Sequence, residues 1–173
     1  MSLSTLPWKT IKFITDPEQG FFKYLVKSYL LAFIPVQVLA LFISFMNIDG
    51  SNSDDYLLDQ SEQILEIVAG FVFIAPIIET ILIALFITAI SLIIKNVYTV
   101  SFITALIAGL IHSLFIPFWG IHTFWPFFIF SMAFLTWRKI SFIKGFLMAN
   151  AIHLLYNIVP TIAIILDTLE PPG

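Results

Sequence analysis

Glu79 is the only charged residue within residues 67–94, an apolar stretch long enough to cross a membrane. An ionisable side chain at mid-membrane depth costs about 3 kcal/mol or more and commonly marks a functional site. Other apolar segments carry polar residues of matching kinds, namely His112 and the pair His153 and Asn157. These residue types predict buried acid–base chemistry in which a water molecule is activated.

The expected reaction is hydrolysis of an amide bond without a covalent intermediate. Glu79 with His112 could polarise a water for attack on a peptide carbonyl. His153 and Asn157 are one helical turn apart and could both donate hydrogen bonds to the developing oxyanion. No cofactor is expected for this chemistry. A zinc ion bound by Glu79, His112 and His153 is the alternative.

Other known designs for such chemistry are missing from the sequence. The chain has no cysteine, which excludes disulfides, thiolate metal sites and thiol nucleophiles. It has no Gly-x-Ser-x-Gly, no His-Glu-x-x-His and no pair of aspartates within an apolar segment.

Composition places these residues in a membrane. The chain is 60% hydrophobic and only 11% charged, with a mean hydropathy of +1.01. A soluble domain of 173 residues could not bury that much apolar surface. We therefore expect an all-α, polytopic transmembrane helix bundle. The expected partners are the lipid bilayer, a peptide or membrane-protein substrate and, as an option, further copies of the chain in a homo-oligomer, with no nucleic acid.

Hydropathy predicts five spanning helices, at residues 28–48, 64–94, 97–116, 122–137 and 145–166. The second is longer than the ~30 Å hydrocarbon core, so it is tilted, bent near Pro76 or projects from the bilayer. The fourth is short and aromatic.

The positions of the charged residues favour a chain with its N-terminus inside and its C-terminus outside. This orientation places all eight basic residues on the cytoplasmic side: Lys9, Lys12, Lys23, Lys27, Lys95, Arg138, Lys139 and Lys144. The acidic residues of the first outer loop and of the C-terminus then lie outside: Asp49, Asp54, Asp55, Asp59, Glu62, Glu66, Asp167 and Glu170. The predicted location is a cell membrane, with the bacterial cytoplasmic membrane favoured.

Residues 1–27 are predicted to form a cytoplasmic, amphipathic interfacial helix, ahead of a single transmembrane bundle at residues 28–173. Thr15 is the expected N-cap of this helix, with Pro17 in its first turn and Glu18 completing a capping box. Aromatic residues alternate with lysines, which suits an anionic lipid surface: Trp8, Phe13, Phe21 and Phe22. The simpler alternative is a juxtamembrane anchor without lipid specificity.

Helical spacing predicts that the polar residues meet. Counted from the cytoplasmic ends at 1.5 Å per residue, Glu79 lies ~24 Å deep, His112 ~21 Å, His153 ~14 Å and Asn157 ~20 Å. Asn150 shares a helix face with the last two and is expected to make only a helix–helix hydrogen bond.

His112 lies at the edge of a predicted helix-packing stripe. Ser101, Ala105 and Gly109 form a small-xxx-small pattern that allows close helix approach. His122 lies in a short aromatic outer loop and is expected to be solvated or interfacial.

Three motifs resemble the CAAX-protease and bacteriocin-processing (CPBP, or Abi) membrane proteins, relatives of the Rce1-type prenyl-protein endopeptidases. The resemblance spans residues 75–160, within a CPBP-like core at residues 64–167. The family's Pro followed by Glu-Glu-xxx-Arg reads here as Pro76-Ile-Ile-Glu79-Thr-Ile-Leu-Ile-Ala. Its Phe-xxx-His reads as Ala108-Gly-Leu-Ile-His112, and its His-xxx-Asn is intact from His153 to Asn157.

The resemblance implies a metal-independent glutamic peptidase. It implies that Glu79 and His112 hold the attacking water and that His153 and Asn157 form the oxyanion site. The chain departs from the family at Thr80, Ala84 and Ala108, where the family has its second Glu, its Arg and its Phe. Thr80 and Ala84 are spaced i, i+4, so a supporting ion pair is absent as a unit.

Two further function classes stay open at this point. One is a catalytically impaired CPBP relative that acts by binding, in bacteriocin immunity or as a membrane scaffold. The other is a small transporter in which Glu79 carries a proton.

Overall fold

The structure is a computed structural model, and it describes residues 12–45, 60–116 and 119–169. Within these ranges every regular element is helical, which confirms the all-α expectation. The elements are a 3₁₀ turn, η1, and six α-helices with a π-helical segment, η2: η1 Phe13–Thr15, α2 Phe21–Phe45, α3 Gln60–Ile67, η2 Val68–Ile74, α4 Ala75–Ile93, α5 Val97–Phe115, α6 Trp119–Trp137 and α7 Phe142–Leu169.

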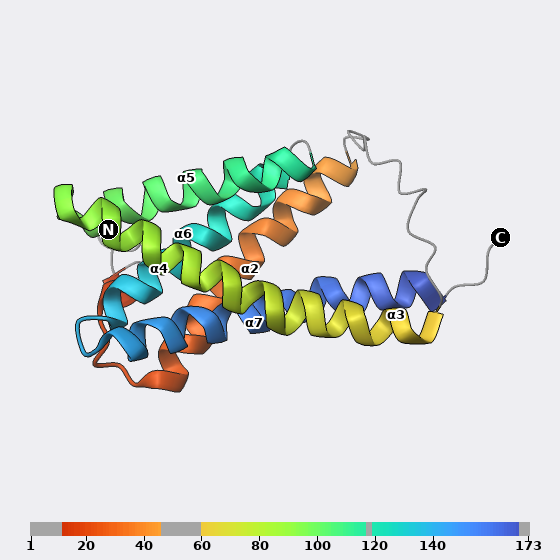
Figure 1. The fold of residues 1–173 in the computed structure, drawn as a ribbon, viewed down its shortest axis with the longest axis horizontal. Helices are drawn as coiled ribbons and strands as arrows, with labels where there is room; N and C mark the ends of the chain where they lie inside the picture. Colours follow the sequence, from red (N-terminus) through yellow and green to blue (C-terminus); the bar gives the residue numbers. More distant parts are fainter. Residues whose placement is uncertain (1–11, 46–59, 117–118, 170–173) are drawn as a thin grey trace, which may run out of the picture.

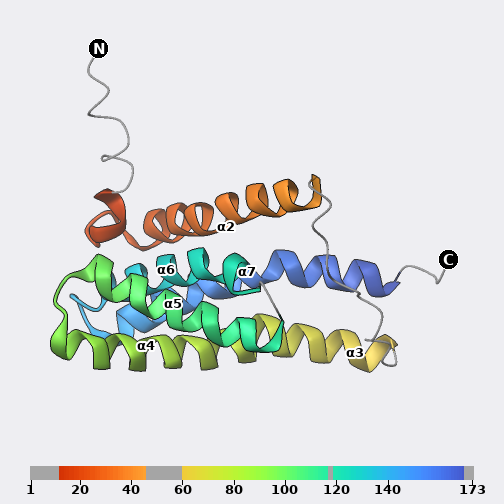
Figure 2. The ribbon, with the colours of Figure 1, turned by 90° about the horizontal axis from the view of Figure 1, so that it is seen from above.

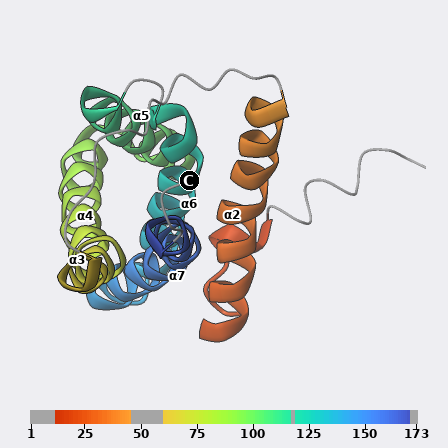
Figure 3. The same ribbon diagram turned by 90° about the vertical axis from the view of Figure 1, so that its right-hand side faces the viewer.

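Helix α6 forms the centre of the bundle. Nearly every side chain of its second half is buried, including Phe130 and Phe134 at 0% exposure. Viewed along the bundle, α4, α5, α6 and α7 surround a common interior, and α2 packs on α6 and α7 at the face away from α4 (Figure 3). Each helix that carries a candidate catalytic residue therefore contributes to one interior.

Four helical segments are long and apolar enough to cross a membrane: Phe21–Ile43, Ile64–Ile93, Val97–Phe115 and Phe142–Leu166. They correspond to the first, second, third and fifth predicted spans, although the first begins seven residues earlier than predicted. The helix predicted at residues 122–137 is present as α6. Most of α6 is buried by the helices around it, which agrees with its central position.

The predicted interfacial helix at the N-terminus is wrong within residues 12–20. Thr15 ends the turn η1 and donates to the Lys12 carbonyl oxygen at 3.1 Å, so it is not an N-cap. Gly20 has a φ of 88°, a conformation that few other residues adopt, and α2 begins directly after it. Trp8 and the rest of residues 1–11 lie outside the described residues.

The turn η1 is anchored on the bundle instead of lying apart from it. Ile14 is 2% exposed, and its carbonyl oxygen accepts hydrogen bonds from Tyr24 Oη and Thr136 Oγ1, each at 2.7 Å. The two donors come from α2 and α6, so η1 joins the ends of these helices. A lysine lies over the aromatic ring of this segment, with Lys27 Nζ 5.2 Å from the Phe13 ring centroid.

The predicted small-residue stripe of α5 packs against α6, as expected. Ser101 and Ala105 are fully buried, and Gly109 faces Gly120 so closely that a Cβ on Gly109 would lie 3.0 Å from the Gly120 carbonyl oxygen. Helices in lipid associate through such close packing because no hydrophobic force favours protein over lipid tails. This contact fixes the position of α5 one turn from His112.

A proline in α2 creates a polar contact between helices. Pro35 has no N–H, so the carbonyl of Leu31, four residues earlier, lacks its helical donor. Trp125 of α6 supplies one, donating from Nε1 to the Leu31 oxygen at 2.7 Å. The candidate active site contains a second side chain that donates to a carbonyl freed by a proline.

Helices α3 and α4 run as one long helix through η2, the π-helical segment that ends just before Pro76. The α3 end of this long helix and the second half of α7 both extend beyond the end of α5 (Figures 1 and 2). This agrees with a second predicted span that is longer than the bilayer core.

Candidate active site

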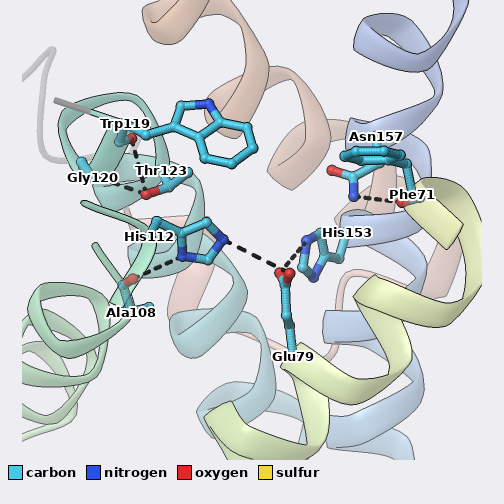
Figure 4. Close-up of polar contacts among 9 residues, drawn as sticks. All are labelled: Phe71, Glu79, Ala108, His112, Trp119, Gly120, Thr123, His153 and Asn157. Atoms are coloured by element: carbon cyan, nitrogen blue, oxygen red, sulfur yellow. Dashed lines mark hydrogen bonds and ion pairs between the residues drawn. The ribbon is translucent and has the colours of Figure 1, made fainter. Parts of the chain in front are cut away.

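The structure brings together three of the four predicted site residues, from three different helices. The Glu79 carboxylate of α4 lies between the His112 ring of α5 and the His153 ring of α7 (Figure 4). Glu79 Oε2 is 3.3 Å from His153 Nε2, and Glu79 Oε1 is 3.8 Å from His112 Nε2. The side chains of Glu79, His112 and His153 are 26%, 18% and 3% exposed, so the cluster lies inside the bundle with access from one side.

The contacts of His112 define which of its nitrogens carries a proton. Its Nδ1 lies 2.8 Å from the carbonyl oxygen of Ala108, which can only accept a hydrogen bond, so Nδ1 is the donor. A neutral His112 therefore directs a bare Nε2 at Glu79. The 3.8 Å gap between Nε2 and Oε1 exceeds a direct hydrogen bond, and one water can bridge two such acceptors by donating a hydrogen bond to each.

His153 has a different environment. Its ring stacks on Phe130 at a centroid distance of 4.4 Å and meets the edge of Phe127 at 5.4 Å. Its Nδ1 is buried and has no hydrogen-bond partner, whereas its Nε2 faces Glu79. The arrangement fits a neutral ring that donates from Nε2 to Glu79 Oε2 and so holds the carboxylate in place. Sequence reasoning predicted the helix that carries the two phenylalanines but not its packing against His153.

Asn157 lies one turn above His153 but contacts another partner. Its Nδ2 donates to the Phe71 carbonyl oxygen of η2 at 2.8 Å (Figure 4). The Ala75 N–H is used by Gly70 in the π-helical pattern, and the next donor in that pattern would be Pro76, which has none. Asn157 replaces this missing donor, and one N–H of its amide is left for another acceptor.

We predict that Asn157 and Pro76 are energetically coupled. Replacing Asn157 by Leu leaves the Phe71 carbonyl without a donor and should lower the free energy of unfolding by about 1 kcal/mol. In a Pro76→Ala background the backbone N–H gained at position 76 can reach that carbonyl, so the same replacement should cost much less. A double-mutant cycle of unfolding in mild detergent measures the coupling. Equal costs in both backgrounds would show that the proline does not create the need for Asn157.

The positions at which the chain departs from the CPBP motif lie inside the bundle. Thr80 is fully buried with a hydroxyl that lacks a hydrogen-bond partner, and Ala84 is 5% exposed. A Glu and an Arg at these positions would have to pair within the protein interior. Asn150 also has a buried amide oxygen without a partner, so the helix–helix hydrogen bond predicted there is not made by that oxygen.

The zinc alternative finds no preformed ligand set. Each histidine directs Nε2 at its own oxygen of Glu79, so the carboxylate itself occupies the space between the rings (Figure 4). In the part of the chain that the structure describes, no group of three or more His, Asp or Glu is arranged to hold a metal ion. Zinc binding at Glu79, His112 and His153 stays a prediction to be tested.

An open groove of about 530 Å³ leads to Glu79 along the long helix. It is lined mainly by apolar side chains of η2 and of the adjoining turns of α3 and α4, with Glu79 at one end and Glu66 at the other. This groove gives the carboxylate its exposure, and it is large enough for several residues of an extended peptide.

Comparisons of the chain with protein-family models, with curated proteins and with solved structures find no match. The resemblance to the CPBP proteins is one of three short motifs, in their order and spacing.

Proposed function

We propose that the protein is a membrane-embedded peptidase of CPBP type that hydrolyses a peptide bond with a water activated by Glu79 and His112. The observation that carries the proposal is the Glu79 carboxylate, which lies 3.8 Å from His112 Nε2 and lines an open groove. A water between these two acceptors would be polarised by both, as general-base catalysis requires.

The remaining residues take positioning and stabilising roles in this proposal. His153 donates to Glu79 and holds it against His112. The second amide N–H of Asn157 is the donor for the oxyanion, while the first is used by Phe71. The role of His153 thus differs from the oxyanion donor that the motif implies. The mechanism uses no metal.

The proposal includes the membrane topology. Four helices suit a membrane by length and composition, and α6 would be the fifth, central span. With the N-terminus inside, all eight basic residues fall on the cytoplasmic side of a multi-pass protein of the cell membrane.

A cleavage assay with His112→Phe tests the function. Purified protein in lipid nanodiscs is incubated with apolar peptides, and products are read by mass spectrometry. Phe preserves ring contacts with Trp119 and Phe127 but removes the nitrogen that faces Glu79. We expect kcat to fall about 100-fold, the range for loss of a general base.

His122→Phe is the matched control, because it makes the same replacement at the start of α6, and it should cleave at the wild-type rate. If the wild-type protein cleaves no peptide while its cellular phenotype survives both Glu79→Gln and His112→Phe, the protein acts by binding. Proton transport into sealed vesicles that depends on Glu79 would favour the carrier function instead.

A further inference from the structure

The groove beside Glu79 has a carboxylate at each end and apolar side chains between them. Glu66 of α3 lies at its far end, and Ile67, Ile74 and Ile78 are among the apolar residues that line the groove between the two acids. Glu66 is exposed, and Ile74 and Ile78 are 55% and 52% exposed, so the wall is open to an occupant.

The floor of the groove is kept open by a glycine. Gly70 lies in η2 on the same face, and a Cβ built there would meet no atom within 4 Å. Larger side chains at this position would fit without disturbing the helix and would fill the groove. The space in front of Gly70 is therefore open because this residue has no side chain, and not because of the way the helices pack.

The charge at the Glu66 end has one sign. The two charged residues among those that line the groove, Glu66 and Glu79, are both acidic. A ligand that enters from the Glu66 end meets this carboxylate first and an apolar wall next. The complementary ligand has a cationic group followed by apolar groups.

From this geometry we infer that the groove binds an extended peptide whose basic side chain pairs with Glu66 while its apolar side chains lie along η2. The inference rests on the proposed peptidase function and adds a substrate preference to it. Glu66 and Glu79 are about 20 Å apart at the helical rise of 1.5 Å per residue. An extended chain covers that distance in about six residues, so the basic residue lies about six residues from the scissile bond.

The test uses apolar peptides in which one lysine replaces glutamine at successive positions on either side of the cleaved bond. Binding is measured on the Glu79→Gln protein in nanodiscs, and cleavage on the wild type. A lysine about six residues from the bond should tighten binding and raise kcat/KM about threefold to fivefold, the effect of an exposed ion pair. Glu66→Gln should remove this preference, and Glu66→Lys should reverse it toward peptides with glutamate at that position.

Two further variants test whether the peptide lies in the groove itself. Gly70→Leu should weaken binding of every peptide long enough to reach Glu66, and Glu18→Gln, at an exposed position outside the groove, should change nothing. If Glu66→Gln and Gly70→Leu both leave peptide binding unaltered, the groove holds lipid and the inference fails.

The experiment distinguishes a failure of this inference from a failure of the peptidase proposal. A lysine preference in binding without any cleavage by the wild type would support the groove and overturn hydrolysis. Cleavage that ignores the lysine position would support hydrolysis and overturn the groove.

Discussion

Replacing Glu79 by Gln should lower kcat by about 10³-fold while the protein stays folded. Gln has the shape of Glu and can still accept a hydrogen bond from His153, so the cluster keeps its geometry. It cannot take a proton from water, and loss of a general base costs about 10²–10⁴-fold. A loss of about 10³-fold corresponds to about 4 kcal/mol of transition-state stabilisation. Single-turnover cleavage in nanodiscs, read by mass spectrometry, measures the rate.

Glu18→Gln is the matched control, since it removes an exposed carboxylate outside the apolar helical segments and should leave kcat unchanged. Removing the charge of Glu79 from a membrane interior should leave thermal stability the same or higher. Wild-type activity should also withstand a strong chelator. Undiminished cleavage by Glu79→Gln would assign the base to another residue, and activity lost with chelator and regained with zinc would replace the metal-free mechanism.

The long apolar helices can be predicted from sequence because each is a nearly continuous apolar run. The second, third and fifth predicted spans agree with the helical segments Ile64–Ile93, Val97–Phe115 and Phe142–Leu166. The place of α6 cannot be predicted in this way, since a helix surrounded by protein needs no uniform hydropathy. The start of α2 is missed for a local reason, because Thr15 ends the turn η1 and the helix begins directly after Gly20, which has a positive φ.

The candidate site also has features that the sequence predicts and features that it does not. Depth counting allows all four residues to meet in one layer, and it places Asn157 closer than His153 to the depth of Glu79 and His112. The structure instead brings His112 and His153 to Glu79, and Asn157 bonds to Phe71. The partner of Asn157 depends on a π-helical turn, which hydropathy does not reveal. Only Pro76, which deprives an earlier carbonyl of its donor, gives a sequence signal, and the choice of Phe71 depends on the register of η2.

The two proline contacts have a common physical consequence. Each proline frees one carbonyl in an apolar environment, where an unsatisfied polar group costs several kcal/mol. Trp125 satisfies Leu31 between α2 and α6, and Asn157 satisfies Phe71 between η2 and α7. Such bonds specify one helix arrangement, which apolar packing in lipid specifies weakly.

The crossing of α5 and α6 should be the position most sensitive to added volume. A Cβ at Gly120 would overlap the Gly109 carbonyl oxygen and Ser113 Oγ, and the backbone oxygen cannot rotate away. Gly120→Ala should therefore force the two helices apart and destabilise the protein by about 3 kcal/mol, at the upper end for overpacking. For a chain of this size that corresponds to a fall in Tm of about 6–12 °C. Thermal unfolding in detergent, followed by tryptophan fluorescence, measures it.

Gly70→Ala is the control for Gly120→Ala, because it adds the same methyl group where no atom lies within 4 Å. Its Tm should stay within about 2 °C of wild type, since a surface replacement of this kind changes stability by about 0.5 kcal/mol at most. Gly120→Ala should also reduce cleavage, because Gly109 lies one turn from His112 and a shift of α5 widens its 3.8 Å gap to Glu79. An unchanged Tm for Gly120→Ala would mean that α5 and α6 do not cross this closely.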